Sequence, residues 1–314
     1  MNKVTIIGTG NVGSTIAYSL MIMDIAGEIV MIDACNEKAV GEALDIQQGT
    51  PYGGICNIYA GDYSDAKDSD IVIITSGVAR QPGQSRLDLA QVNTDITKSI
   101  IPQIVKNAPD AKYIIVSNPV DILTYVFFKR SGLPENQIIG SGTILDTARL
   151  RSRLAQCFQI NQRNVHAYVL GEHGDSSFVP WSLTNISNVP VAEYKAAVTA
   201  GRDKIPDFSH KEIEEYVQRS GARIIERKGA TFYAVSASVC HIVKTMLTGI
   251  DTTMTVSTMM DGEYGISDVC LSVLNIVGTN GATGKVMLPL AGDEIAKLRH
   301  SADTLKSVIR QLTI

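Results

Sequence analysis

The sequence has few of the features that mark specialised protein classes. Its cysteines are odd in number and contain no C-x-x-C pair. This excludes a simple disulfide scaffold and gives no zinc signature, so we expect no metal site. We expect free thiols, most of them buried, in a reducing and therefore cytoplasmic setting. The five positions are Cys35, Cys56, Cys157, Cys240 and Cys270.

Charge and hydropathy exclude further classes. The net charge is −4, the isoelectric point is near 5.8 and no run of like charge stands out, which argues against nucleic acid as a partner. No stretch reaches the roughly 18 consecutive apolar residues of a membrane helix. Glycines interrupt the apolar start of the chain too early for a signal peptide. Low-complexity tracts are absent and 45% of the 314 residues are hydrophobic, so a packed core is expected.

The first half of the chain alternates short apolar runs with helical patterns. Helical spacing is found at residues 14–23 and 37–48. The apolar runs are rich in β-branched residues, as buried parallel strands are, and they lie at residues 4–7, 29–32, 71–74 and 113–116. This alternation predicts an α/β fold with a Rossmann-type doubly wound parallel sheet over residues 1–142.

The pattern changes after about residue 142, with no Ser/Pro-rich linker or internal repeat. A turn at Asp261-Gly262 separates two expected strands, and Gly229 breaks a helical stretch. Helices are expected at residues 145–157, 211–228, 234–247 and over about the last 20 residues, and strands at 165–170, 254–260 and 269–277. We therefore expect a second, mixed α+β domain at residues 143–314, for substrate binding, catalysis and oligomerisation, packed closely on the first.

A glycine motif opens the first domain. The segment Gly8-Thr9-Gly10-Asn11-Val12-Gly13 is G-x-G-x-x-G, placed between a predicted strand and a predicted helix. Gly8 allows a tight turn, Gly10 lets a pyrophosphate approach and Gly13 permits close helix packing. The helix N-terminus then faces the pyrophosphate with its partial positive charge. The alternative is a glycine-rich turn that binds nothing.

An acidic residue selects between the two nicotinamide cofactors. Asp33 ends the next predicted strand, where a carboxylate accepts hydrogen bonds from the ribose hydroxyls. The same charge repels a 2′-phosphate, so NAD is favoured over NADP.

Hydride transfer to a carbonyl needs a proton donor, and His173 is the candidate. It lies in Gly171-Glu172-His173-Gly174-Asp175, where glycines leave the ring accessible, and an imidazole near its natural pKa works in both directions. Asp146 is a candidate partner, and Arg149 shares its helix face. The alternatives are a structural histidine and a simple surface ion pair.

The loop at residues 77–86 carries two arginines, Arg80 and Arg86, after an apolar strand. Arginine presents a fork that matches carboxylates, so two forks indicate a small, multiply anionic substrate.

Four motifs together resemble those of the L-lactate/malate dehydrogenase family, and overall the lactate branch is nearest. They occur in family order across essentially the whole chain. The motifs are G-T-G-N-V-G-S, S-N-P-V-D at residues 117–121, G-S-G-T-I-L-D-T-A-R at 140–149 and G-E-H-G-D-S-S at 171–177.

The resemblance implies roles for the candidate residues. His173 is the acid/base with Asp146 as its partner, and Arg149 binds the substrate carboxylate. Arg86 polarises the carbonyl from a closing loop, Asn118 lies by the nicotinamide and the substrate oxygen, and Thr231 lies at the substrate. Implied cofactor positions are Gly8, Gly10, Asn11, Val12, Gly13, Asp33, Lys38, Tyr63, Thr75, Gly77, Val78, Ser99, Val116 and Asn118.

The family position six before Arg86 contacts the substituent on C3 of the substrate. It is typically glutamine in lactate dehydrogenases and arginine in malate dehydrogenases, and here it is Arg80. Arg80 would pair with the second carboxylate of oxaloacetate but lie unpaired beside pyruvate.

In contrast, the segments around Arg86, Trp181 and Thr231 resemble the lactate branch. We expect a lactate dehydrogenase with substantial oxaloacetate activity. The alternatives are malate dehydrogenase as the main activity, and an Arg80 side chain that turns to solvent.

The resemblance also implies regulation and assembly. Arg151 and His166 match the fructose 1,6-bisphosphate anchors of allosteric bacterial lactate dehydrogenases, where paired copies make a cationic site across a two-fold interface. The alternative is a pair of unrelated residues. A homodimer or homotetramer without an N-terminal arm and a place in glycolysis are likewise implied.

Two other functional classes are weighed. A non-catalytic NAD-binding sensor would keep the glycine motif but could lose His173, Asp146 or the arginines, all of which are present. An NAD-dependent glycosidase would need a metal site, and the sequence has no convincing Cys/His cluster.

Overall fold

The computed structural model describes residues 2–78 and 85–314, without the side chains of Arg86 and Arg202. A nine-stranded sheet runs through the molecule in the order β12-β11-β10-β6-β5-β4-β1-β2-β3. Six neighbouring strands are parallel, as expected for a Rossmann-type sheet, so the predicted fold class is confirmed. These strands are β1 (Lys3–Ile7), β2 (Glu28–Ile32), β3 (Asn57–Ala60), β4 (Ile71–Ile74), β5 (Lys112–Ile115) and β6 (Ile138–Gly140).

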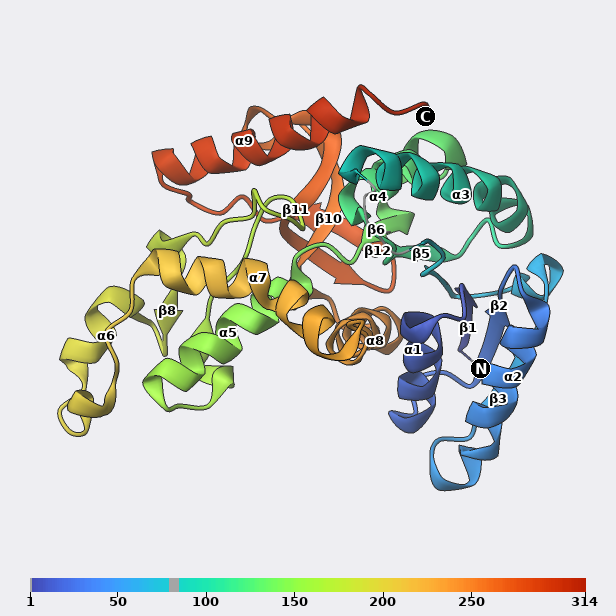
Figure 1. The fold of residues 1–314 in the computed structure, drawn as a ribbon, viewed down its shortest axis with the longest axis horizontal. Helices are drawn as coiled ribbons and strands as arrows, with labels where there is room; N and C mark the ends of the chain where they lie inside the picture. Colours follow the sequence, from blue (N-terminus) through green and yellow to red (C-terminus); the bar gives the residue numbers. More distant parts are fainter. Residues whose placement is uncertain (1, 79–84) are drawn as a thin grey trace.

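Helices cover both faces of the parallel strands (Figure 1). Side chains alternate between the faces, so β1 places Val4 and Ile6 in one apolar cluster and Ile7 in the other. Helices α1 (Asn11–Ile22), α2 (Asn36–Gln48) and α8 (Tyr233–Thr248) pack in the first cluster. Helices α3 (Arg86–Asn107) and α4 (Val120–Ser131) pack in the second.

The second half extends the same sheet with antiparallel strands. β10 (Thr252–Asp261) pairs with β11 (Ser267–Gly278), which pairs with β12 (Gly281–Lys285). β10 joins the parallel part at one residue pair, Ser257 with Gly140. A small separate sheet contains β7 (Val165–His166), β8 (Asn185–Ile186) and β9 (Val189–Pro190).

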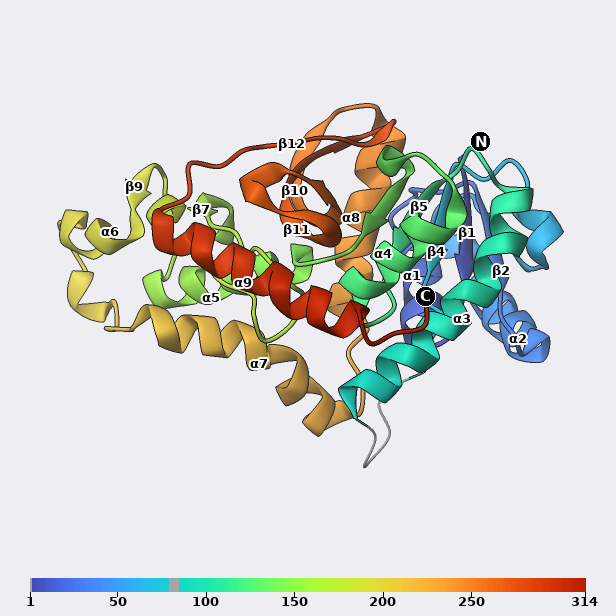
Figure 2. The same ribbon diagram turned by 90° about the horizontal axis from the view of Figure 1, so that it is seen from above.

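The remaining helices surround the second half. Helix α9 (Gly292–Ile309) runs across β11 toward α4, and the chain ends beside α3 (Figure 2). The remaining α-helices are α5 (Ile144–Phe158), α6 (Val191–Ala197), α7 (His210–Lys228) and α9 (Gly292–Ile309). The 3₁₀ helices are η1 (Thr50–Tyr52), η2 (Tyr63–Ala66), η3 (Glu135–Gln137), η4 (Gln162–Asn164), η5 (Trp181–Leu183), η6 (Arg202–Lys204) and η7 (Glu263–Gly265). None of the helices in the described residues has the length and apolar character needed to cross a membrane.

The strand expected at residues 165–170 is wrong beyond its first two residues. The chain leaves β7 after His166. The following apolar residues Ala167 and Val169 are buried in an apolar cluster without belonging to a strand. Leu170 then bridges Phe178, and Gly171 bridges Ser272 of β11. Strands β3 and β6 were not expected from the sequence, because β3 has only one buried residue of four and β6 is only three residues long.

Candidate active site

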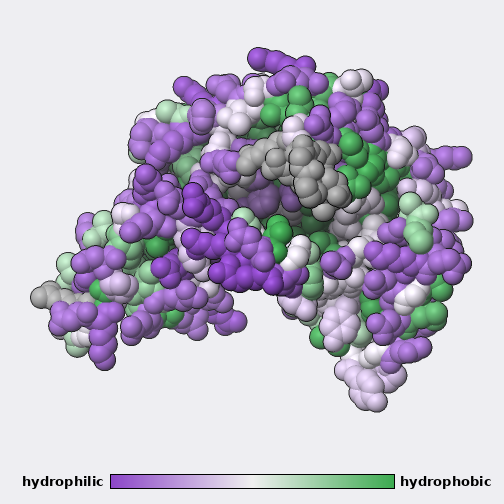
Figure 3. Space-filling view, viewed as in Figure 1, coloured by the Kyte–Doolittle hydropathy of each residue, from purple (hydrophilic) through white to green (hydrophobic). Residues whose placement is uncertain are grey.

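A cavity of about 550 Å³ lies where the carboxyl ends of the parallel strands meet α5, α7 and α8. Figure 3 shows the surface hollowed there, beside the hydrophilic side chains over α7. Ligands in open α/β sheets bind at this edge. The cavity brings together ten expected site residues from segments far apart in the sequence, namely Val12, Thr75, Gly77, Val78, Val116, Asn118, Asp146, Arg149, His173 and Thr231.

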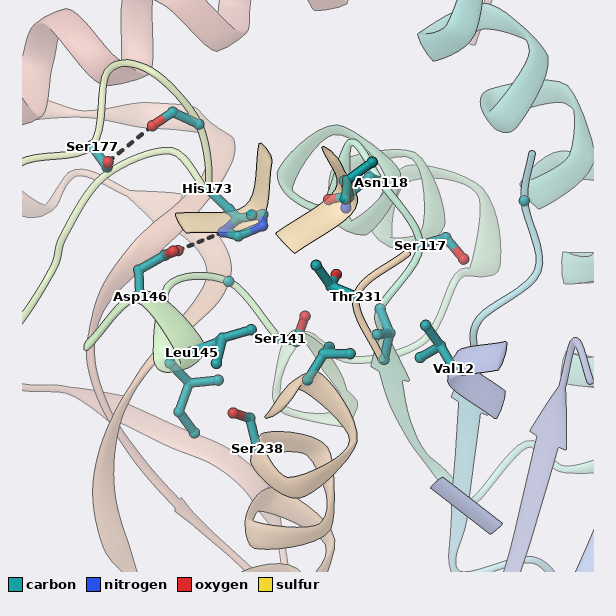
Figure 4. A pocket seen from close by; sticks show the side chains of 18 of the residues that line it. Val12, Ser117, Asn118, Ser141, Leu145, Asp146, His173, Ser177, Thr231 and Ser238 are labelled. Carbon is teal, nitrogen blue, oxygen red and sulfur yellow. Dashed lines mark hydrogen bonds and ion pairs between the residues drawn. The ribbon is translucent and has the colours of Figure 1, made fainter. Parts of the chain in front are cut away.

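His173 and Asp146 form a direct pair in this cavity. The Nδ1 atom of His173 lies 2.5 Å from Oδ2 of Asp146, which is in the first turn of α5. The Asp146 side chain is 8% exposed and the His173 side chain 27%. Figure 4 shows His173, Asn118 and Thr231 around a common space, with Asp146 behind the imidazole. The ring therefore reaches the cavity while the carboxylate holds it from behind.

The same pair shifts the pKa of the imidazole. The Asp146 carboxylate raises the pKa of His173 to about 9, although burial acts in the opposite direction. Burial would raise the pKa of Asp146, but His173 and Arg149 outweigh it and lower that pKa. The expectation that the imidazole keeps its natural pKa is therefore wrong. The buried Asp146 carboxylate is the reason for this higher pKa, and at neutral pH the ring therefore carries its proton.

Arg149 lies on the same face of α5 as Asp146. Its Nη1 atom is 2.9 Å from Oδ1 of Asp146, so the carboxylate is shared between the histidine and the arginine. The i,i+3 ion pair weighed from the sequence does form, but it is partly buried at the cavity wall rather than on the open surface. Gly221 on α7 lies beside the guanidinium, and a Cβ there would make an ordinary van der Waals contact at 3.9 Å from Nη2.

The glycine motif has the geometry that a pyrophosphate cradle needs. Gly8 has a φ of +102°, and a Cβ there would lie 2.7 Å from the Ser76 nitrogen. A Cβ on Gly13 would lie 1.9 Å from the Gly8 carbonyl oxygen. In contrast, a Cβ on Gly10 would meet nothing within 4 Å. Gly8 and Gly13 therefore allow the close turn and the helix contact. Gly10 leaves open space before α1 and its first residue, Asn11.

Asp33 lies directly after β2, beside the glycine motif. Its carboxylate accepts hydrogen bonds from the Thr9 amide at 2.6 Å and the Cys35 amide at 2.9 Å. Burial would raise the pKa of Asp33, but these hydrogen bonds outweigh it and lower that pKa. The ionised carboxylate is thus held at the place where the adenosine ribose of a dinucleotide would need an acceptor.

Several expected site residues lie outside the cavity lining. Lys38 is exposed on α2, and Tyr63 is half-buried in η2. Ser99 is exposed on α3 and donates its hydroxyl proton to the Ile96 carbonyl. Arg80 lies outside the described residues, and Arg86 is the first residue of α3.

The two expected effector residues lie at the small sheet, away from this cavity. Arg151 on α5 donates from Nε to the Ala167 carbonyl at 3.0 Å. His166 precedes Ala167 and is exposed in β7. The fold thus brings Arg151 to the segment that carries His166.

Asn93 is a buried residue of the cavity wall that the sequence reasoning missed. On α3 its side chain accepts from the Val78 amide at 2.9 Å and donates to the Asn118 carbonyl at 2.7 Å. It therefore connects the segment after β4 with the one that carries Asn118. Helical periodicity could have found it, because Asn93 shares the buried face of α3 with Ala90 and Thr97.

The dinucleotide fold and the histidine–carboxylate pair define a class, the NAD-dependent dehydrogenases. Residues 2–140 match the family model of the lactate/malate dehydrogenase NAD binding domain, and residues 143–313 match that of the lactate/malate dehydrogenase alpha/beta C-terminal domain. The chain belongs to the lactate/malate dehydrogenase family, as its motifs indicated, and NAD(H) is its cofactor.

Relatives cover the whole chain. An L-lactate dehydrogenase of Thermoanaerobacter pseudethanolicus is 48% identical over 100% of both chains. One of Acetivibrio thermocellus is 46% identical over 100% of this chain and 98% of the relative. The crystal structure of a minor L-lactate dehydrogenase from Enterococcus mundtii superposes with a TM-score of 0.94 at 37% identity, covering 100% of this chain and 99% of that one.

Proposed function

We propose that this protein is an L-lactate dehydrogenase that interconverts pyruvate and L-lactate, with additional activity on oxaloacetate. The observation that carries the proposal is the His173–Asp146 pair, which lines one cavity together with Arg149 and Asn118. The names of the curated relatives support lactate as the product.

The residues of the cavity supply the proton and the binding contacts. His173, protonated at neutral pH, donates its proton to the carbonyl oxygen of the 2-oxo acid, and Asp146 stabilises the imidazolium. Arg149 binds the substrate carboxylate through its guanidinium fork. Asn118 and Thr231 line the same cavity and contact the substrate, and Arg86 polarises its carbonyl. NADH, when bound, supplies the hydride.

We assign the cofactor to the first half of the chain. The glycine motif holds the pyrophosphate and Asp33 the adenosine ribose, with Val12, Thr75 and Val116 lining the nicotinamide end. We place Lys38, Tyr63 and Ser99 at the cofactor's periphery, since they do not line the cavity. Residues 1–142 form this NAD-binding domain, and residues 143–314 form the substrate and oligomerisation domain.

Arg80 is the basis of the oxaloacetate activity. Its guanidinium would pair with the second carboxylate, whereas an unpaired buried charge beside the pyruvate methyl group costs several kcal/mol. Malate dehydrogenase as the main activity is the second candidate, and the same residue favours it. The lactate-type relatives favour pyruvate.

Steady-state kinetics with both 2-oxo acids test this proposal. We expect kcat/KM for oxaloacetate within about tenfold of that for pyruvate, and a decrease of at least about tenfold for oxaloacetate in Arg80→Gln. Arg80→Lys, which keeps the charge but loses the fork, serves as the matched comparison. A preference for pyruvate of tenfold or more in the unaltered enzyme would show that Arg80 does not select the substrate.

A non-catalytic NAD-binding sensor is the alternative from another class. His173→Asn separates it from an enzyme. An enzyme should keep its NADH affinity and lose turnover by about 10²–10⁴-fold in this variant. A sensor should show no 2-oxo acid reduction even before the substitution.

A further inference from the structure

The turn that carries Thr231 lies between the ends of two helices. Helix α7 ends at Lys228, and α8 begins at Tyr233. Gly229 follows α7 with a φ of +83°, and Thr231 lines the cavity two residues later. In Figure 4 Thr231 lies beside the space that the ring of His173 also reaches. The position of Thr231 therefore depends on how the end of α7 is held against the start of α8.

The start of α8 is fixed against the glycine motif. Ser236 is fully buried, and its hydroxyl donates to the Phe232 carbonyl at 2.6 Å, with the Val12 carbonyl as a second acceptor at 3.4 Å. Val239 and Cys240 of the same helix are buried in the apolar cluster that also contains side chains of α1. The α8 side of the turn is therefore held by the core of the first half of the chain.

The end of α7 has no such burial. The buried residues of this helix, which is described in full, are Ile213, Val217 and Ser220. From Gly221 onward its residues are partly or fully exposed. Two of the later basic side chains contact α7 itself, since Arg223 lies over the Tyr216 ring and Arg227 donates to the Arg223 carbonyl. Burial therefore fixes the first part of α7 but not its end.

Lys228 connects the end of α7 to the start of α8. Its Nζ atom lies 3.4 Å from the centre of the Phe232 ring and 4.0 Å from the centre of the Tyr233 ring. The two rings meet edge to face, with their centres 4.5 Å apart. An ammonium group is attracted to the face of an aromatic ring when it lies within about 6 Å of the ring centre. The side chains of Lys228, Phe232 and Tyr233 thus form an aromatic clamp across the turn.

The segment that the aromatic clamp holds forms one wall of the cavity. Gly221, Ala222 and Ile225 of α7 line the cavity before Lys228, and Thr231 lines it between Lys228 and the two rings. The three side chains of the clamp lie outside the cavity lining. They therefore act on a bound substrate through the wall rather than by touching it.

We propose that Lys228 is a positioning residue for substrate binding, which holds Thr231 and the end of α7 at the cavity through its contacts with the two rings. This inference rests on the proposed function, because that function assigns Thr231 to the 2-oxo acid. The clamp acts on substrate affinity rather than on the proton and hydride steps. Loosening it should therefore raise KM and leave kcat nearly unchanged.

Two substitutions of Lys228 separate the cation from the apolar stem. Lys228→Met keeps an unbranched apolar side chain and loses the charge, and we expect KM for pyruvate to rise about threefold to tenfold with kcat within about twofold. Lys228→Arg keeps a cation that stacks on aromatic rings, so its KM should stay within about twofold of the unaltered enzyme. NADH affinity, measured by fluorescence titration, should stay within about twofold in both variants, because the α8 side of the turn remains in place.

A double-mutant cycle tests whether the charge acts through the rings. Phe232→Leu removes one ring and keeps the ammonium, so it should raise KM about as much as Lys228→Met. The double variant should exceed the larger single increase by no more than about twofold, since both substitutions remove the same contact. If Phe232→Leu does not fold, Tyr233→Leu takes its place in the cycle, because the Tyr233 side chain is 69% exposed.

Arg227 provides a matched control for charge at the end of the helix. Arg227 and Lys228 both lie in the last turn of α7, where a positive charge stabilises the carbonyl end of a helix. Arg227→Met should therefore lower the melting temperature about as much as Lys228→Met does. It should leave KM for pyruvate within about twofold, because the contact of Lys228 with the rings is kept.

The outcomes are distinct. A KM within twofold of the unaltered enzyme in Lys228→Met overturns the inference, and so does an equal increase in Arg227→Met. A KM as high in Lys228→Arg as in Lys228→Met also overturns it, as do increases that multiply in the double variant. The proposed function fails separately, if the unaltered enzyme does not reduce pyruvate or His173→Asn retains its rate.

Discussion

At the scale of single residues, one carboxylate controls the chemistry of the cavity. Asp146 contacts both the imidazole of His173 and the guanidinium of Arg149. It raises the pKa of His173 to about 9, so the proton needed for ketone reduction is already bound at neutral pH. The reverse reaction needs the neutral ring and is favoured as pH rises through that pKa.

Asp146→Asn removes this charge, so the pKa of His173 should fall toward its ordinary value of 6.5. Pyruvate reduction requires the protonated ring and is lost above the pKa. Its kcat/KM should therefore decline at a pH at least about 1 unit lower in the variant. The measurement is the profile of kcat/KM between about pH 6 and pH 10. Asp62→Asn, at the exposed start of η2, should leave the profile unchanged, and an unshifted midpoint in Asp146→Asn would contradict the pairing.

At the scale of elements, the turn between β1 and α1 depends on the absence of side chains. Gly13 packs against the Gly8 carbonyl so closely that any Cβ would overlap with it. A Cβ on Gly41, within α2, would meet no atom within 4 Å. The two helical glycines therefore differ in packing but not in secondary structure.

Gly13→Ala should lower the free energy of unfolding by about 1–3 kcal/mol and weaken NADH binding, because the helix must move away from the turn. Gly41→Ala is the matched substitution, and it should stabilise the protein by about 0.5–1 kcal/mol through the higher helix propensity of alanine. Urea denaturation and NADH titration measure both effects. Equal stability changes in the two variants would mean that the turn relaxes without cost.

At the scale of the whole molecule, the two halves share one sheet and further contacts. Ser257 pairs with Gly140 across the junction, and α8 packs against α1. The end of the chain adds hydrogen bonds, because Lys98 on α3 donates to the Thr313 carbonyl at 2.9 Å and Arg130 on α4 donates to Ile314. Relative movement of the halves is therefore restricted by many contacts, which suits a site built from both.

The effector proposal also belongs to this scale. Arg151 contacts Ala167, the chain neighbour of His166, and paired copies in a homodimer or homotetramer would double the positive charge. We propose fructose 1,6-bisphosphate as an activator that lowers the KM for pyruvate. Initial rates with and without the sugar phosphate at several pH values measure this effect, and Arg151→Gln should abolish it. An unchanged KM at every pH would remove the proposal.

Much of the first half was predictable because its signals are local. The strands at residues 4–7 and 71–74 and the helix at 37–48 follow from hydrophobic periodicity, and the structure has elements there. In the second half, the end of α7 at Gly229 was predictable because glycine readily adopts the positive φ, here +83°, that follows the end of a helix. Strand β3 was missed because only Ile58 of its four residues is buried, which leaves no alternating pattern to detect.

The sequence by itself determined the glycine turn, the acidic residue after β2 and the membership of a family, because each depends on residues adjacent or at fixed spacing. Only the tertiary structure decided that Asp146 raises the pKa of His173, since that shift needs burial and a contact between α5 and a distant loop. It also placed Asp121 of α4 between His173 and Ser257, which come from separate parts of the chain. Contacts of this kind leave no periodic pattern in the sequence, because folding brings their residues together.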